Sequence, residues 1–174
     1  MRKHCFTCLY IVVALLGWAV TASAAWTDMK PAVITSGWAC THGHAGHIQG
    51  SLSGSFSYMG WGLDVTLNPP SSNWVHYSLP VPAGHKTRHI NISFHSYSND
   101  VLINQVDIWD GGVSVDSIPV TGWTGNDVTI DQGVTLSADH VVTDALGVSI
   151  LLGSGVENLS HRIILYTVCA DMFP

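Results

Sequence analysis

Apolar and polar residues alternate at every second position along much of this chain, and this pattern is what most limits how the chain can fold. In residues 88–97, Ile90, Ile92 and Phe94 share one face of an extended segment, and mainly polar residues occupy the other. Residues 147–152 also alternate, while residues 162–169 are apolar on both faces. A period of two predicts β-strands rather than helices, and a strand that is apolar on both faces is expected to be central.

Turn-forming residues interrupt these segments at roughly the spacing of an all-β sandwich. Examples are Asn68-Pro69-Pro70, Asp110-Gly111-Gly112 and Gly153-Ser154-Gly155. We therefore expect an all-β fold, a two-sheet antiparallel β-sandwich of jelly-roll-like form. The expected strands are residues 36–42, 46–53, 56–67, 73–79, 88–97, 102–109, 113–118, 127–130, 145–152 and 161–171.

The N-terminal residues have the three parts of a secretory signal. A basic start, Met1-Arg2-Lys3, precedes an apolar run over residues 9–20 and the small-residue sequence Ala22-Ser23-Ala24. The sequence thus predicts a signal peptide over residues 1–24, a lead-in over 25–35 and a β-sandwich domain over 36–174. The alternative is an uncleaved membrane anchor, for which the apolar run is short. We expect a secreted or periplasmic protein with no membrane contact after cleavage.

Charge argues against nucleic acid as a partner. Cleavage would leave four basic residues against twelve acidic ones, a net charge of −8. Such a chain has no basic patch that could displace counterions from phosphates. A glycan or a protein is the expected partner, and the sequence leaves the oligomeric state open.

Two cysteines, Cys40 and Cys169, would remain after cleavage, one near each end of the domain. An even pair in an exported chain predicts a disulfide, with two buried free thiols as the alternative. The bond would bring the first and last strands together.

Residues 73–174 resemble a group of uncharacterised small bacterial β-sandwich proteins, a domain of unknown function. The matching segments are Trp74-Val75-His76 leading to Leu79-Pro80-Val81-Pro82, then residues 106–111, 147–150 and 169–173. Trp38 and His42-Gly43 are similar to that group's opening strand, whereas the Gly-rich residues 43–62 depart from it. The resemblance implies a compact sandwich and no particular activity.

Histidine is unusually frequent, and three residues lie close together at His42, His44 and His47. Residues two apart on a strand face the same way, so His42 and His44 could chelate one ion, with His47 returning from the turn as a third ligand. Three imidazoles suit zinc or copper. The alternative is a polar strand end whose histidines bond locally. A weaker second cluster is His85, His89 and His95.

Aromatic residues give a second candidate site. Tyr58, Trp61 and Trp123 lie in Gly-rich surroundings, which favours exposure and predicts stacking against a ligand such as a sugar ring. Trp74 and Trp109 are expected in the core, which is the usual place for tryptophan.

Recognisable catalytic motifs are missing from the sequence. Gly50-Ser51-Leu52-Ser53-Gly54 has leucine at the position of the nucleophile in a Gly-x-Ser-x-Gly elbow, and Glu157 is the single glutamate. Asp107, Asp110 and Asp116 surround a Gly-Gly pair, but a hairpin turn explains them better than a calcium loop. We therefore expect no enzyme and no catalytic residues, but an exported binding or structural module; metal binding and carbohydrate binding are the alternatives.

Overall fold

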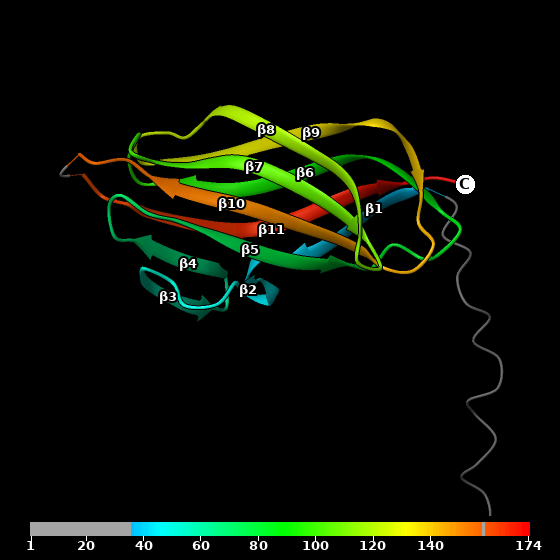
Figure 1. The fold of residues 1–174 in the computed structure, drawn as a ribbon, viewed down its shortest axis with the longest axis horizontal. Helices are drawn as coiled ribbons and strands as arrows, with labels where there is room; N and C mark the ends of the chain where they lie inside the picture. The colour runs from blue at the N-terminus through cyan, green and yellow to red at the C-terminus, as the bar shows by residue number, and fades with distance from the viewer. Residues whose placement is uncertain (1–35, 158) are drawn as a thin grey trace, which may run out of the picture. The chain divides into compact units, whose positions relative to one another are not determined.

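The computed structural model describes residues 36–157 and 159–174, and these form two antiparallel β-sheets packed face to face (Figure 1). One sheet has the strand order β3-β4-β11-β6-β9, with β1 also paired to β11, and the other has the order β2-β5-β10-β7-β8. The predicted two-sheet antiparallel β-sandwich is confirmed. The predicted signal peptide and lead-in lie outside the described residues. Within the described ranges, no helix is long and apolar enough to cross a membrane.

The elements follow one another closely along the chain. They are β1 (Gly37–His42), η1 (Gly43–Ala45), β2 (His47–Ile48), β3 (Gly54–Met59), β4 (Gly62–Leu67), β5 (Ser72–Leu79), β6 (Lys86–Ser96), β7 (Val101–Asp110), β8 (Val113–Trp123), β9 (Val128–Val141), β10 (Leu146–Ser154) and β11 (Arg162–Met172), where η1 is a single 3₁₀ turn.

The core lies between the sheets and is built from the alternating apolar positions. Ile90, Ile92 and Phe94 of β6 are fully buried, as their shared face predicts. The expectation of a central strand at residues 162–169 is also correct, because β11 pairs with β6 on one side and with β4 and β1 on the other. Ile163 and Ile164 point to opposite faces of β11, and both are buried.

Four predicted strands differ from the structure by more than two residues at one end. The strand predicted over 113–118 extends to Trp123 as β8. Residues 56–67 form a hairpin, β3 and β4, because Gly60 and Trp61 make the turn between the paired residues Met59 and Gly62. The strand predicted over 46–53 shortens to β2, and the strand predicted over 127–130 extends to residue 141. The alternation does not predict this extension because Asp131, Gln132 and Gly133 interrupt it, although they pair with β6.

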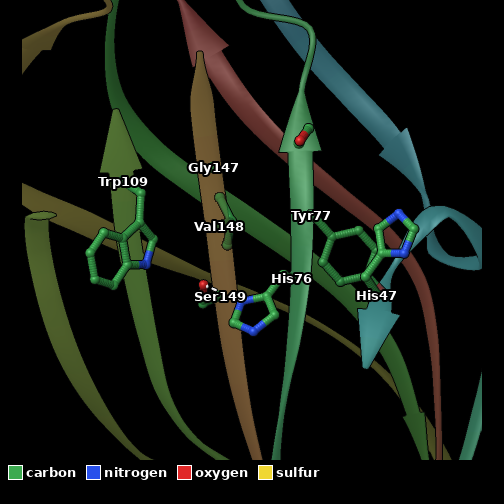
Figure 2. Close-up of a pocket in the computed structure, with 8 residues that line it drawn as sticks. His47, His76, Tyr77, Trp109, Gly147, Val148 and Ser149 are labelled. Atoms are coloured by element: carbon green, nitrogen blue, oxygen red, sulfur yellow. Dashed lines mark hydrogen bonds between the residues drawn. The ribbon is translucent and has the colours of Figure 1, made fainter. Parts of the chain in front are cut away.

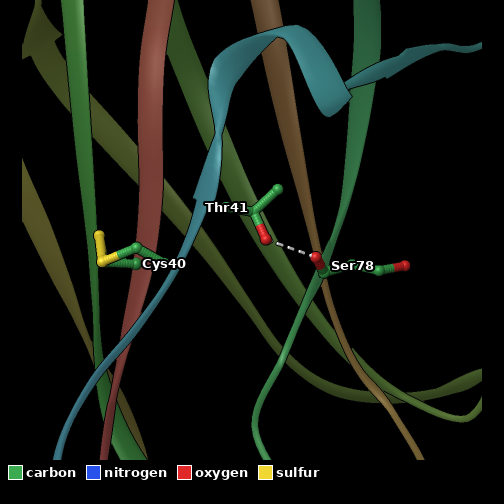
Figure 3. The surroundings of a disulfide bond; sticks show 4 residues. Cys40, Thr41 and Ser78 are labelled. Atoms are coloured by element: carbon green, nitrogen blue, oxygen red, sulfur yellow. Dashed lines mark hydrogen bonds between the residues drawn. A yellow bond between two sulfur atoms is a disulfide. The ribbon is translucent and has the colours of Figure 1, made fainter. Parts of the chain in front are cut away.

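The predicted disulfide joins Cys40 of β1 to Cys169 of β11 (Figure 3). The two cysteines are direct partners in the antiparallel pairing of these strands. The next residue, Thr41, points the other way, and its hydroxyl donates a hydrogen bond of 2.8 Å to the carbonyl oxygen of Ser78 in β5. The short β1 strand is therefore attached to both sheets.

Two aspartate side chains, those of Asp110 and Asp171, each accept several hydrogen bonds from irregular backbone. The buried carboxylate of Asp110, at the end of β7, accepts bonds from the N–H groups of Thr143, Asp144 and Ala145 and from the side chains of Thr143 and His140. This agrees with the interpretation of Asp110-Gly111-Gly112 as a hairpin turn, since β8 begins at Val113. These bonds fix the loop between β9 and β10 against the turn between β7 and β8.

The second carboxylate belongs to Asp171 in β11. It accepts bonds from the hydroxyl of Thr87 and from the N–H groups of Arg88 and His89, at the point where the pairing of β6 with β9 shifts in register. The carboxylate satisfies backbone donors that a regular ladder would otherwise pair.

Candidate functional site

The outer face of the five-stranded sheet carries a pocket of about 310 Å³ (Figure 2). The residues that line it come from four neighbouring strands: His47 from β2, His76, Tyr77 and Ser78 from β5, Trp109 from β7, and Gly147, Val148 and Ser149 from β10. Its volume is at the lower end of the range typical of small-molecule sites.

Strand register brings the outward-facing side chains of the pocket together. His47 lies opposite His76, His76 lies opposite Ser149, and Ser149 lies opposite Asp107 on its other side. His76 Nδ1 and Ser149 Oγ are 2.7 Å apart and hydrogen-bonded. Asp107 accepts a hydrogen bond of 2.7 Å from the Ser117 hydroxyl. One polar row therefore crosses the sheet, at right angles to the strands.

A glycine makes the floor of the pocket beside a tryptophan. Gly147 lies directly opposite Trp109 on one side and Ser78 on the other. Because Gly147 has no side chain, the face of the sheet is open between Trp109 and β5. A Cβ atom placed on Gly147 would meet Trp109 Cβ at 3.5 Å, an ordinary contact, so the backbone here does not itself require glycine.

Among the described residues, the lining of the pocket contains no aspartate, glutamate, lysine or arginine. Its titratable groups are two imidazoles and one phenol. Burial lowers the pKa of His76 below its usual value, and the nearby His47 lowers it further. Burial, with a smaller effect of Tyr58, raises the pKa of Tyr77, whose hydroxyl donates to the Gly43 carbonyl oxygen at 3.1 Å. Because the described lining residues hold no carboxylate, ammonium or guanidinium group, the pocket suits an uncharged ligand.

The contact between Ser149 and His76 is not arranged as a catalytic triad. In a triad the carboxylate orients the imidazole from the side away from the serine. Here Asp107 lies beyond Ser149, and the strand position on the other side of His76 is occupied by His47. The order of the row is therefore Asp–Ser–His–His, in which the carboxylate is on the wrong side of the serine to orient His76.

The structure does not bring His42, His44 and His47 together, so the expected convergence of the three rings is wrong. The η1 turn carries the chain from β1 in one sheet to β2 in the other, which places His47 opposite His76. His42 and His44 do meet, with their Nδ1 atoms 2.7 Å apart. In the part of the chain that the structure describes, no three His, Cys, Asp or Glu side chains are grouped to hold a metal ion.

The second histidine cluster is also dispersed. His89 bonds to Thr135 of β9, whereas His95 bonds to Thr129 and Asp127. Each of these two imidazole rings is hydrogen-bonded to its own neighbours on β9 or in the turn before it. They share the outer face of the six-stranded sheet without converging.

Of the three aromatic candidates, Tyr58 and Trp61 are exposed and Trp123 is not. Trp123 is 8% exposed, and its ring stacks on Phe94 with centroids 6.4 Å apart, so the expectation of an exposed Trp123 is wrong. The reason is that β8 extends to Trp123 and pairs it with Ile103, which turns the indole into the core. Tyr58 and Trp61 are about half exposed on the β3–β4 hairpin, and ligand binding by them stays a prediction.

Trp74 and Trp109 are expected in the core, but both are only partly buried. The sequence carries the signal for Trp109. Val106 and Ile108 are fully buried, so the alternation places Asp107 and Trp109 together on the outer face. The general preference of tryptophan for the core predicts burial instead. For that reason Trp109, which forms one side of the pocket, is not among the predicted ligand-binding residues.

No protein-family model matches the chain, and no curated protein matches it in sequence. The resemblance to uncharacterised bacterial sandwich proteins therefore stays a prediction. Among solved structures, the chain is similar to CBM86, a low-affinity xylan-binding module from Roseburia intestinalis, with a TM-score of 0.53 and 9% identity over 78% of this chain and 95% of that one.

Two further similar structures are carbohydrate-binding modules by name. CBM29_1 from Piromyces equi has a TM-score of 0.49 and 10% identity, covering 78% of this chain and 90% of that chain. The CBM36-1 domain of a xylanase from the hindgut metagenome of Trinervitermes trinervoides has a TM-score of 0.47 and 12% identity, covering 77% and 96%. What these comparisons add is the fold: the chain shares the β-sandwich architecture of CBM86.

Proposed function

We propose that this domain is a non-catalytic module of an exported protein and that it binds a neutral polysaccharide on the outer face of its five-stranded sheet. The observation that carries the proposal is the uncharged pocket in which Trp109 stands beside the open floor at Gly147. The disulfide between Cys40 and Cys169 is consistent with an oxidising compartment.

The chemistry of the pocket fits a sugar. An indole ring offers a flat apolar surface for the C–H face of a pyranose, and an adjacent polar row offers donors and acceptors for its hydroxyls. His76 and Ser149 supply that row beside the Gly147 floor. Of the residues that the structure describes, none in the lining is a cationic side chain for a phosphate or carboxylate ligand or an anionic one for a cation.

Two other observations support a binding role without catalysis. The Asp–Ser–His–His row lacks the order that activates a serine. The similar module CBM86 is described as a xylan-binding module. Xylan is therefore the first polysaccharide to test, followed by other soluble neutral glycans.

The experiment is affinity electrophoresis and calorimetry with soluble xylan and a panel of neutral polysaccharides. We expect the parent to bind at least one of them, Trp109→Ala to lose that binding, and Gly147→Val to lose it by filling the floor. Trp38→Ala is the matched control, since Trp38 is 56% exposed on the opposite side, on the outer face of the six-stranded sheet. If the parent binds none of the panel, or Trp109→Ala binds as tightly as the parent, the proposal fails.

A second candidate function is the binding of zinc or copper by His42 and His44. Its specific support is that the two Nδ1 atoms face each other at 2.7 Å. A small movement would let both nitrogens ligate one ion, with water completing the coordination. A copper titration should show one site in the parent and in His47→Ala, but none in His42→Ala/His44→Ala. Equal binding by the double variant and the parent would contradict it.

A further inference from the structure

The exposed aromatic residues of β3 lie on an uncovered part of the inner face of the six-stranded sheet. Phe56 and Tyr58 are the direct strand partners of Val65 and Leu63, which are fully buried in the core. Residues directly opposite in an antiparallel pair project to the same face. Phe56 and Tyr58 are nevertheless 44% and 52% exposed. They are exposed because the other sheet ends at the two-residue strand β2 and does not cover β3.

This arrangement puts the β3 aromatics on the same side of the domain as the pocket. In a sandwich, the inner face of one sheet and the outer face of the other point in the same direction. The pocket lies on the outer face of the five-stranded sheet, and Phe56 and Tyr58 lie on the inner face of the six-stranded sheet, beyond the β2 edge. The two surfaces therefore face the same way but lie at two levels, and we refer to these two levels as the two steps.

The two steps are also connected. η1 contacts both β3 and β4 and leads directly into His47, which lines the end of the pocket away from Trp109 (Figure 2). Tyr58 lies near enough to Tyr77, another lining residue, for its phenol to raise the pKa of Tyr77. Phe56 and Tyr58 contact each other edge to face, with ring centroids 5.5 Å apart.

Charge is absent along this path. Between His47 and Asp64 the sequence contains no Asp, Glu, Lys or Arg, and Ser55 and Ser57, which alternate with Phe56 and Tyr58, project to the other face of β3. A chain with a formal charge of −6 thus presents, on the β3 side of the pocket, a neutral strip in which the rings of Phe56 and Tyr58 have no charged residue of their own segment beside them. A neutral polyhydroxylated chain is the ligand that this strip suits, because an ionic partner would find no charge to pair with.

We infer that the ligand is an extended neutral polysaccharide chain that fills the pocket beside Trp109, crosses β10, β5 and β2, and continues onto Tyr58 and Phe56 of β3. This rests on the proposed function and deepens it. From β7 to β2 the path spans three strand spacings, ~14 Å, before it reaches β3. A disaccharide would occupy only the pocket, whereas a long chain would contact both steps.

The test compares xylobiose with soluble xylan, or the corresponding short and long forms of whichever glycan the parent binds. We expect Phe56→Ala/Tyr58→Ala to weaken polymer binding about tenfold and leave disaccharide binding unchanged. Trp109→Ala should weaken both ligands. Trp38→Ala, an equally exposed aromatic on the opposite face, should affect neither. Thermal unfolding of each variant checks that the fold is retained.

The outcomes separate the two proposals. If Trp109→Ala abolishes binding while Phe56→Ala/Tyr58→Ala binds polymer as tightly as the parent, ligand binding in the pocket is supported and the extension of the ligand to β3 is overturned. An affinity that is the same for disaccharide and polymer, or an equal loss in Trp38→Ala, overturns the extension as well. If no glycan binds the parent, the proposed function itself has failed.

Discussion

Cys40 and Cys169 are directly opposite each other on neighbouring antiparallel strands, with their Cα atoms 4.0 Å apart, although 129 positions separate them in the sequence. The bond joins the first and last strands of the sandwich within one sheet. It closes a loop that contains nearly every residue of the core. Its effect on stability should therefore come mainly from the entropy of the unfolded chain.

Removing the disulfide should destabilise the domain without changing its fold. For a loop of this length the chain-entropy relation gives about 4–5 kcal/mol, and measured values for native disulfides are about 2–5 kcal/mol. We expect Cys40→Ser/Cys169→Ser to lower the free energy of unfolding by about 2–4 kcal/mol in urea denaturation. A reducing agent should lower the parent's stability similarly and leave the double variant unchanged. A parent that is insensitive to reduction would contradict the structure.

Asp110 should make stability depend on pH in the acid range. Burial tends to raise the pKa of its carboxyl, but the backbone N–H groups of Thr143 and Asp144, with His140 and the Thr143 hydroxyl, outweigh burial and hold the pKa well below its usual value. A depressed folded-state pKa contributes stability above the unfolded value of about 3.9, and this contribution is lost as pH falls toward the folded value.

Asp110→Asn should therefore cost about 2–4 kcal/mol near neutral pH, because the substituted amide loses the charge and presents N–H groups to buried donors. The difference from the parent should shrink below about pH 4, where the parent loses the stability that its ionised carboxylate contributes. Asp139→Asn is the control: its ion pair with Arg88 is nearly half exposed and should contribute less than about 1 kcal/mol. If the difference in the free energy of unfolding between Asp110→Asn and the parent stays constant from neutral pH to about pH 2, the ionised Asp110 carboxylate is not the source of the stability.

Replacing Gly43 by alanine should destabilise the domain strongly, whereas the same replacement of Gly60 should not. A Cβ atom on Gly43 would lie 1.7 Å from the carbonyl oxygen of Leu165, a backbone atom of the central strand β11. At Gly60, in the β3–β4 turn, nothing lies within 4 Å of the same atom. We expect Gly43→Ala to destabilise the domain by more than about 3 kcal/mol and Gly60→Ala to change it by less than about 0.5 kcal/mol. Matching urea midpoints for the two variants would show that η1 does not pack on β11 as described.

Trp123 and Trp61 should differ sharply in their effect on folding. The indole of Trp123 is buried against Phe94, and removing a buried tryptophan costs about 3–5 kcal/mol. Trp61 is 47% exposed in a turn, so Trp61→Ala should cost less than about 1 kcal/mol. Thermal and urea unfolding of the two variants would check this. A larger loss of stability in Trp61→Ala than in Trp123→Ala would contradict the burial of Trp123 and the exposure of Trp61.

The sequence alone determined the fold class, the central position of β11 and the pairing of the two cysteines. Each depends on local information: Ile163 and Ile164 indicate burial on both faces, and two cysteines in a chain predicted to be exported have one simple pairing. The alternation around Val106 and Ile108 also contained the outward position of Trp109, although the general preference of tryptophan for the core outweighed it.

Only the tertiary structure decided which side chains meet. His42, His44 and His47 are close in sequence, yet η1 carries His47 into the other sheet and opposite His76. The pocket combines residues from β2, β5, β7 and β10 because the register of four strands brings them together. Register and sheet order are set by packing across the whole core, so no local pattern could place His47, His76 and Trp109 in one site or leave Tyr58 uncovered beside it.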